Sequence, residues 1–259
     1  TLRVEILTEG VHSGEASGVV ASSFRICREL LDRIEDSFDG RMLLPELNVE
    51  IPPDRRRQAS ETATEFPIGG HFPFVAGAEP MVADHTEQLL ARTWYPTLSV
   101  TGVDGIPPVE SAGNVLRPHT SLHLSVRLPP TCVHETALAA IAGALTSDPP
   151  YGAHVSFDDG HSGPGWNAPA FAPWLQAALD DASAANFGNA SRAFGEGGSI
   201  PFMGMLGDMF PEAQFVITGC LGPGANAHGP NEYLHVPTAR RVTSCLATVL
   251  DAHAKRRGE

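Results

Sequence analysis

The feature that most restricts the fold of this chain is the order in which two hydrophobic periodicities alternate along residues 1–157. In four short segments apolar side chains recur at every second position, which is typical of half-buried strands. In two longer segments they recur at every third or fourth position, which is typical of amphipathic helices. The order is strand, helix, strand, strand, helix, strand. The predicted strands are residues 2–6, 97–102, 120–127 and 153–157, and the predicted helices are residues 18–35 and about 133–146.

This order is the split β-α-β-β-α-β pattern of ferredoxin-like domains, so we expect an α+β fold for this part of the chain. The third predicted strand shows the alternation most clearly. Its apolar residues Leu122, Leu124 and Val126 face one way, whereas Arg127 and the other polar residues face the opposite way. The polar face of this strand is therefore open to solvent or to a ligand.

Residues 36–96 interrupt the pattern as a long insertion after the first predicted helix. Within it we expect a strand at residues 47–51 and a helix near residues 87–92. Three consecutive arginines occupy positions 55–57. Such a run is a solvated helix face more often than a clamp for phosphate, and we adopt the first interpretation.

The chain changes character in residues 161–259. Leu175 and Ala178 lie on the apolar stripe of a predicted helix, and residues 214–218 form a very apolar segment typical of a strand covered on both faces. A last helix is predicted at about 238–254. This part resembles an α/β domain, but it is too short to close a sheet of its own, so we expect it to need strands from elsewhere.

Composition excludes some classes of partner. The formal net charge is −13, from 30 acidic and 17 basic side chains, which argues against nucleic acid or an anionic membrane. No apolar run is long enough for a membrane span. None of the four cysteines belongs to a C-x-x-C pair, so we expect a reduced, cytoplasmic protein. The sequence begins at Thr1, directly in a strand-like segment, as expected of a piece of a longer protein.

Two histidines lie where a reactive group could act. His228 follows the apolar segment 214–218 in a Gly/Pro-rich loop, where a neutral imidazole could bind zinc; a surface role is the alternative. His12 lies between a predicted strand and a helix start, where it could donate a hydrogen bond to a developing oxyanion or belong to a capping loop. The same His-Ser-Gly triplet recurs at His161 in an acidic, glycine-rich hinge, where we expect only a turn.

Two further features could contact a ligand. Consecutive glycines in GEGGSIP, residues 195–201, permit close approach of the backbone to a negative group, although a structural turn fits the motif equally well. Arg127, on the polar face of its strand, could bind a substrate carboxylate in a bidentate manner or pair with a carboxylate of the protein.

Together these motifs resemble the carnosinase, aminoacylase and desuccinylase family of two-zinc peptidases. The segments that carry the resemblance stand in the family's order and span nearly the whole chain, and they are most similar to the carnosinase-like dipeptidase branch. The resemblance implies a ferredoxin-like lid, also the dimerisation domain, at residues 1–160, and an incomplete α/β zinc-peptidase catalytic segment at residues 161–259. The segments are VHSG at 11–14, GNVLRP at 113–118, LSVR at 124–127, GEGGSIP at 195–201 and AHGPNE at 227–232.

The resemblance also assigns roles to individual residues. It implies that His228 is the last metal ligand of a two-zinc site. His12 corresponds to the lid histidine that reaches into the partner subunit's active site and polarises the scissile carbonyl. Asn114 corresponds to a residue that touches substrate, and Arg127 to the arginine that holds the substrate carboxylate. The implied substrate is a dipeptide or an N-acyl amino acid, and the implied assembly is a homodimer.

The glycine-rich segment contributes three more implied residues. Glu196, Gly198 and Ser199 correspond to the segment that lines the family's substrate pocket. At the lid histidine the sequence reads HSGEASG, with one glycine at the end where many members have two. That difference weakens the correspondence at Gly18 and leaves His12 in place.

The larger departure is in the metal ligands. The family's other ligands include an H-x-D motif and a Glu-Glu pair that also supplies the general base, and this sequence contains neither. One histidine cannot hold two zinc ions. We therefore expect the chain alone to be inactive, with no zinc or a partial site. The alternatives are a non-catalytic dimerisation module and a family member that has lost its metal site.

Overall fold

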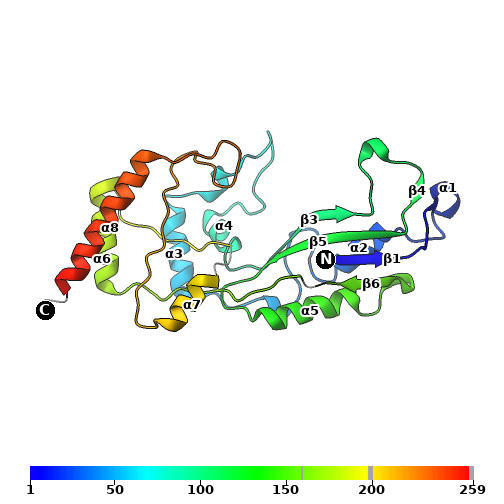
Figure 1. Cartoon of the computed structure of the whole chain (residues 1–259), viewed down its shortest axis with the longest axis horizontal. Coiled ribbons are helices and arrows are strands. Elements are labelled where there is room, and N and C mark those ends of the chain that lie inside the picture. The colour runs from blue at the N-terminus through cyan, green and yellow to red at the C-terminus, as the bar shows by residue number, and fades with distance from the viewer. Residues whose placement is uncertain (159, 198–200, 257–259) are drawn as a thin grey trace. The chain divides into compact units, whose positions relative to one another are not determined.

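The computed structural model describes residues 1–158, 160–197 and 201–256. Contacts within the chain divide it into two compact units (Figure 1). The first unit comprises Thr1–Trp166 and Phe194–Gly204, and the second comprises Asn167–Ala193 and Met205–Glu259. The glycine-rich segment thus packs with the first unit, although it lies far along the sequence from the rest of that unit.

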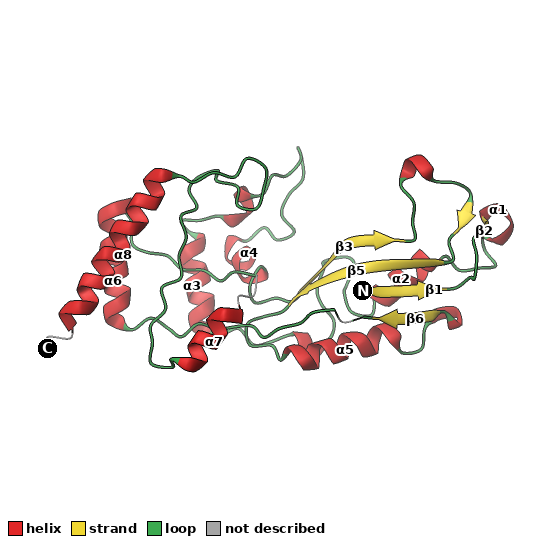
Figure 2. Cartoon of the chain, in the orientation of Figure 1, coloured by secondary structure: helices red, strands yellow, loops and turns green. Residues whose placement is uncertain are grey.

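The first unit is built on a four-stranded sheet that contains all four predicted strands. Its strand order is β3-β5-β1-β6, and every neighbouring pair is antiparallel (Figure 2). The edge strand β3 runs two residues beyond its predicted end through a bulge between Val100 and Gly102. The strands are β1 (Leu2–Glu5), β3 (Thr97–Asp104), β5 (His119–Arg127) and β6 (His154–Phe157).

Two helices, α2 (Ser23–Leu31) and α5 (His134–Thr146), pack against each other and against this sheet. The apolar side chains of both helices and of the central strands β1 and β5 form one buried cluster, because alternate strand residues and helical stripes all face the same layer. The members of this cluster with no exposed surface include Leu2, Val4, Ile26, Leu30, Ala137 and Leu145. The result is a mixed α/β fold.

The first predicted helix was placed too early and ended too late. Gly18 has φ of 89°, a left-handed value that a right-handed helix cannot contain, so the chain turns before α2 begins. A separate short helix, α1 (Ser13–Ala16), precedes the turn. Beyond Leu31 the chain leaves the helix in a turn that still buries Ile34. The apolar stripe seen in the sequence therefore included residues of the helix and of the turns on both sides of it.

The structure also contains a small two-stranded ladder that the periodicity did not predict. β2 (Val11–His12) pairs with β4 (Val115–Leu116) in an antiparallel manner. Two residues per strand are too few for any alternation to be recognised in the sequence. The ladder nevertheless brings together two segments that are about a hundred positions apart.

The insertion at 36–96 is helical. It contains α3 (Pro53–Ala63) and the predicted α4 (His85–Ala91), which pack on each other around the buried Trp94. The strand predicted at 47–51 is wrong, because prolines at 45, 52 and 53 offer no backbone N–H for a ladder and the segment opens with a 3-10 turn. Arg56 and Arg57 are exposed on α3, as predicted, whereas Arg55 is half-buried. The short 3-10 turns of the first unit are Pro45–Leu47, Ile68–His71, Val109–Ser111 and Pro150–Gly152.

The second unit is a pair of helices with long connecting loops. α6 (Pro173–Phe187) and α8 (Val236–Arg256) confirm both predicted helices, and Leu175, Ala178 and Val249 form their buried contact. α7 (Pro201–Met209) follows the glycine-rich segment. The strand predicted at 214–218 is wrong. A strand needs neighbouring strands for its backbone hydrogen bonds, and this segment pairs with none among the residues that the structure describes. Ile217, within the segment, is 55% exposed. In the parts of the chain that the structure describes, no helix combines the length and apolar character needed to cross a membrane.

Candidate functional site

His12 and Asn114 lie side by side at one end of the first unit. His12 pairs with Val115 in the β2–β4 ladder, and the N–H of Ser13 donates to the carbonyl oxygen of Asn114 at 2.9 Å. The His12 side chain is exposed and makes no capping hydrogen bond to α1. A Cβ on residue 14 would lie 2.9 Å from Cε1 of His12, so a side chain there would require the ring to shift. The imidazole is therefore presented to solvent rather than used within the fold.

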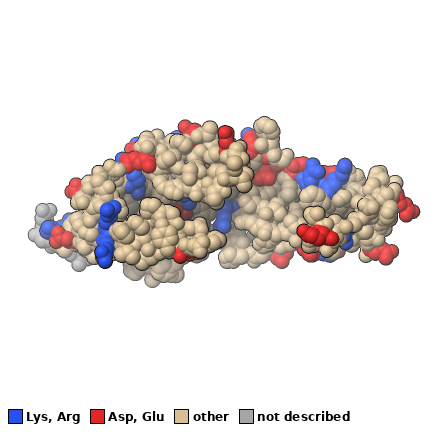
Figure 3. All heavy atoms as spheres, turned by 90° about the horizontal axis from the view of Figure 1, so that it is seen from above, with Lys and Arg blue, Asp and Glu red and all other residues tan. Residues whose placement is uncertain are grey.

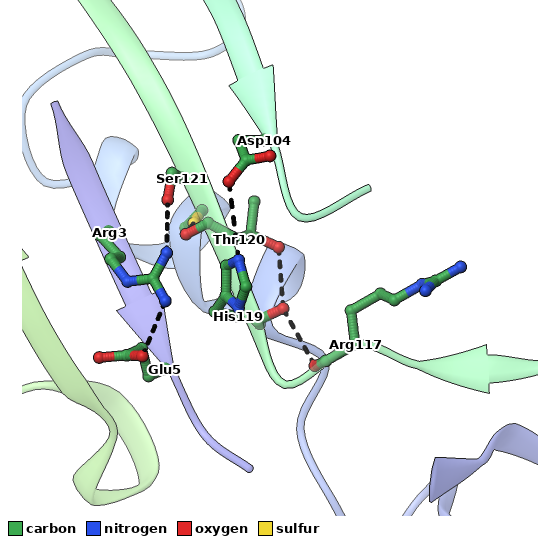
Figure 4. A network of polar contacts seen from close by, with 9 residues as sticks. Arg3, Glu5, Asp104, Arg117, His119, Thr120 and Ser121 are labelled. Carbon is green, nitrogen blue, oxygen red and sulfur yellow. Dashed lines mark hydrogen bonds and ion pairs between the residues drawn. The ribbon is translucent and has the colours of Figure 1, made fainter. Parts of the chain in front are cut away.

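A network of polar contacts holds this end of the sheet together (Figure 4). Arg3 on β1 donates to Glu5 at 2.9 Å and to Ser121 on β5 at 3.3 Å. The Arg3 guanidinium, through its hydrogen bond and its charge, keeps the pKa of the Glu5 carboxyl below its ordinary value. On β5, Nε2 of His119 lies 3.7 Å from a carboxylate oxygen of Asp104 on β3. Side chains thus link β1, β3 and β5 in addition to the backbone ladders.

One buried contact in this network reaches the His12 and Asn114 segment. The hydroxyls of Ser23 on α2 and Thr120 on β5 lie 2.8 Å apart, and both residues are buried. Ser23 also donates to the carbonyl oxygen of Arg117 at 3.4 Å, and Arg117 directly follows β4. A helix of the core therefore helps to fix the direction in which the β2–β4 ladder leaves the sheet.

Arg127 lies at the opposite end of the same sheet. It is the last residue of β5, pairs with Thr97 and is exposed. β5 runs from His119 to Arg127, and at a rise of about 3.3 Å per residue its ends are roughly 26 Å apart. Among the residues that the structure describes, the Arg127 guanidinium has no hydrogen-bond or ion-pair partner. The structure thus separates Arg127 from His12 and Asn114, and it leaves the guanidinium free to bind a ligand.

Glu196 lies at the Arg127 end. Nη2 of Arg92 donates to its carboxylate at 2.7 Å. Arg92 directly follows α4 and stands five residues before Thr97, the residue opposite Arg127. Five residues span at most about 18 Å, so Arg92 and Arg127 belong to the same end of the sheet. Gly198 and Ser199 lie outside the described residues.

His228 belongs to the second unit, in a loop held by its own contacts. Its backbone has φ of 60°, and its N–H donates to a carboxylate oxygen of Glu232 at 3.1 Å. The side chain of Asn226 donates to the carbonyl oxygen of Pro230 at 2.8 Å. The imidazole is exposed. These local hydrogen bonds stabilise the backbone of the loop around His228.

The described residues do not by themselves fit a two-zinc site. Within ranges 1–158, 160–197 and 201–256, no three His, Cys, Asp or Glu side chains lie close enough together to hold a metal ion. His228 could supply one ligand. Cys27 is buried among apolar side chains, and burial raises the pKa of its thiol to about 11, so it is a core residue rather than a thiolate ligand.

The surface charge is dispersed on the face that Figure 3 draws. There Lys and Arg form separate small groups among acidic and uncharged side chains. A continuous basic stripe is the usual footprint of a nucleic-acid-binding surface, and that face does not show one.

Sequence reasoning missed Arg92 and its contacts with the glycine-rich segment. The two partners of the ion pair are 104 residues apart, and neither periodicity nor motif spacing relates such distant positions. The helix predicted near 87–92 placed Arg92 only as a terminal residue of a helix.

Comparisons with known proteins identify the family and the fold of the chain. The sequence model of a family described as a peptidase dimerisation domain, M20 type, matches residues 1–153. A cysteinylglycine-S-conjugate dipeptidase of Corynebacterium striatum is 30% identical over 164 residues, which are 62% of this chain and 35% of the relative. The chain thus spans about a third of that protein.

Solved structures show the same fold. The di-peptidase Dug1p of Saccharomyces cerevisiae matches with a TM-score of 0.72 at 20% identity, over 98% of this chain and 53% of its own. Human carnosine dipeptidase 1 matches with a TM-score of 0.68 at 18% identity, over 98% of this chain and 54% of its own. The M20 family metallo-carboxypeptidase Sso-CP2 of Sulfolobus solfataricus matches with a TM-score of 0.71 at 14% identity, over 96% of this chain and 56% of its own. The chain spans about half the length of each.

Proposed function

This chain belongs to the family of M20-type peptidase dimerisation domains, and from that premise we propose that it is the lid and C-terminal catalytic segment of a zinc-dependent dipeptidase. The proposed substrate is a dipeptide or an N-acyl amino acid. We assign residues 1–160 to the lid and 161–259 to the catalytic segment, in a cytoplasmic homodimer. The relatives' printed activities support the substrate class.

We infer that the lid is ferredoxin-like. The observation behind this inference is the strand order β3-β5-β1-β6 with antiparallel neighbours, together with two helices that pack on the sheet, α2 between β1 and β3 and α5 between β5 and β6. In this arrangement each helix connects strands that are not neighbours, which is the split β-α-β pattern.

The observation that carries the functional proposal is the separation of His12 from Arg127. A dipeptide spans about 7 Å when fully extended, whereas the strand between the two ends measures roughly 26 Å. His12 and Arg127 of one chain therefore cannot contact the same dipeptide. We infer that each active site combines Arg127 of one subunit with the His12 and Asn114 end of its partner.

In this proposal each residue has a stated task. The Arg127 guanidinium binds the substrate carboxylate through charge-assisted hydrogen bonds. The partner's imidazole at position 12 donates a hydrogen bond to the carbonyl oxygen as negative charge develops on it, and Asn114 contacts the substrate beside it. Zinc, bound when the remaining ligands are supplied from outside this chain, would activate the attacking water. His228 would be its one ligand here.

The direct test compares this chain with a longer protein that contains it. The chain of residues 1–259 should release no amino acid from dipeptides in the presence of zinc, because the described residues lack a complete metal site. The longer protein should hydrolyse them and lose activity on chelation. Amino-acid release by the purified 259-residue chain that depends on zinc would refute this division of the enzyme.

A non-catalytic dimerisation module is the second candidate. It is favoured by two observations, the matched family description and the lack of a cluster of metal ligands in the described residues. The coding sequence upstream of Thr1 separates the candidates: an H-x-D motif and a Glu-Glu pair there support the enzyme. If the upstream sequence has neither, the chain is an assembly module or a member without its metal site.

A further inference from the structure

Arg92 contacts the segment at residues 194–197 through two side chains. Arg92 donates to the Glu196 carboxylate at 2.7 Å. Its guanidinium carbon also lies 5.4 Å from the centroid of the Phe194 ring, a cation–π contact. Arg92 thus contacts two side chains of the segment, one on either side of Gly195.

The same segment is stacked on the aromatic part of the insertion. The rings of Phe194 and Phe66 are 5.7 Å apart between centroids with an interplanar angle of 15°. Phe66 in turn packs against His71, at 4.4 Å between ring centroids, and against the buried cluster of α3 and α4. The position of Phe194 is therefore coupled to the core of the insertion.

Two glycines allow the segment to lie directly on the chain at positions 92–93. A Cβ on residue 195 would lie 2.2 Å from Cγ2 of Thr93, and a Cβ on residue 197 would lie 2.5 Å from the carbonyl oxygen of Arg92. Neither neighbour can move aside easily, because one is a β-branched side chain and the other is backbone. The GEG sequence is thus required for this contact, and not only for turning the chain.

We propose that Arg92 is a positioning residue, which fixes residues 194–197 through Glu196 and Phe194 and thereby positions the substrate pocket beside them. This proposal rests on the proposed function and on the family resemblance, by which Glu196 belongs to the segment that lines the substrate pocket. Glu196 is then the attachment point for Arg92 rather than a group that binds substrate. An exposed ion pair alone is a weak contact, so Arg92 acts together with the two glycine contacts.

The first experiment measures the attachment and does not depend on peptidase activity. In Arg92→Ala, amide hydrogen exchange at residues 194–197 should become roughly three- to tenfold faster, since the charge and cation–π contacts are lost. Arg56→Ala is the matched control, because it removes an exposed ion pair of the same insertion, Arg56 to Glu87 at 2.9 Å. Equal exchange at 194–197 in wild type and Arg92→Ala would overturn the proposal.

A charge exchange distinguishes the ion pair from a general loss of packing. Arg92→Glu should accelerate exchange at 194–197, and the double variant Arg92→Glu with Glu196→Arg should restore much of the protection. If the double variant is as fast as the single one, Glu196 is not the attachment point. Gly197→Ala should also accelerate exchange, whereas Gly163→Ala should not, because a Cβ at 163 would meet nothing within 4 Å.

The second experiment measures positioning in the complete enzyme. Arg92→Ala should lower kcat/KM for a dipeptide by about 10- to 100-fold, because small displacements of a binding segment are costly. The zinc content and the dimer should remain those of wild type. A merely structural role would lower the amount of folded enzyme and leave kcat/KM per folded enzyme unchanged, so a wild-type kcat/KM overturns the proposal. If the wild-type enzyme cleaves no dipeptide, the proposed function fails, while the exchange data still decide the attachment.

Discussion

Replacing His12 with alanine in the complete enzyme should lower kcat for dipeptide hydrolysis by roughly 100- to 1000-fold, the usual cost of losing one donor to an oxyanion. Stability should change little, because the imidazole is exposed and makes no capping hydrogen bond. His161→Ala is the matched control, since it alters the other His-Ser-Gly triplet of the chain. Steady-state kinetics of the purified enzymes give kcat for His12→Ala and for the control His161→Ala. A His12→Ala enzyme within a few-fold of wild type would contradict the proposed role.

Mixed dimers test whether His12 acts on its partner's site. Arg127→Ala should also inactivate the homodimer, because a charge-assisted carboxylate contact is lost. In a heterodimer of His12→Ala and Arg127→Ala chains, one of the two sites combines an intact Arg127 with the intact His12 of the other chain. Random mixing makes about half of the dimers heterodimers, so the mixture should recover about a quarter of wild-type activity. No recovery would mean that both residues serve the same subunit.

Leu30→Ala should lower the free energy of unfolding of the first unit by about 3 kcal/mol, within the usual range for a fully buried leucine. Leu30 has 0% exposed surface and belongs to the cluster between α2, α5 and the sheet. Phe24→Ala in the same helix is the control; that ring is 43% exposed, so its removal should cost less than about 1 kcal/mol. Urea unfolding followed by circular dichroism gives both values. Equal losses would show that the core does not lie where the structure places it.

The four strands of the main sheet and the two helices that pack on it could be predicted from sequence because their periodicities repeat over several residues. β5 is the clearest case, since Leu122, Leu124 and Val126 alternate with polar neighbours. The limits of α2 were missed because Gly18 breaks the backbone conformation without breaking the apolar stripe. The β2–β4 ladder was missed because two-residue strands have no period. Side-chain periodicity therefore identifies long helices and strands, whereas their ends depend on backbone conformations such as that of Gly18.

The apolar segment at 214–218 shows a different limit. Its composition is that of a buried strand, but a strand is stable only when neighbours satisfy its N–H and C=O groups. The described chain supplies no such neighbours, so composition alone could not decide the conformation. The ion pair between Arg92 and Glu196 lay beyond prediction for a related reason: each partner has an ordinary local sequence, and only the tertiary fold brings them together.

The length of β5 sets the distance between the two ends of the lid in the proposed enzyme. A deletion of two residues would keep every side chain on its face but would shorten the strand by about 7 Å, and a deletion of one would turn Arg127 to the other face. The two active sites of a dimer would then no longer be spaced to share their residues. Substitutions on the polar face of β5 at positions other than Arg127 should therefore preserve activity, whereas insertions and deletions within its nine residues should abolish it.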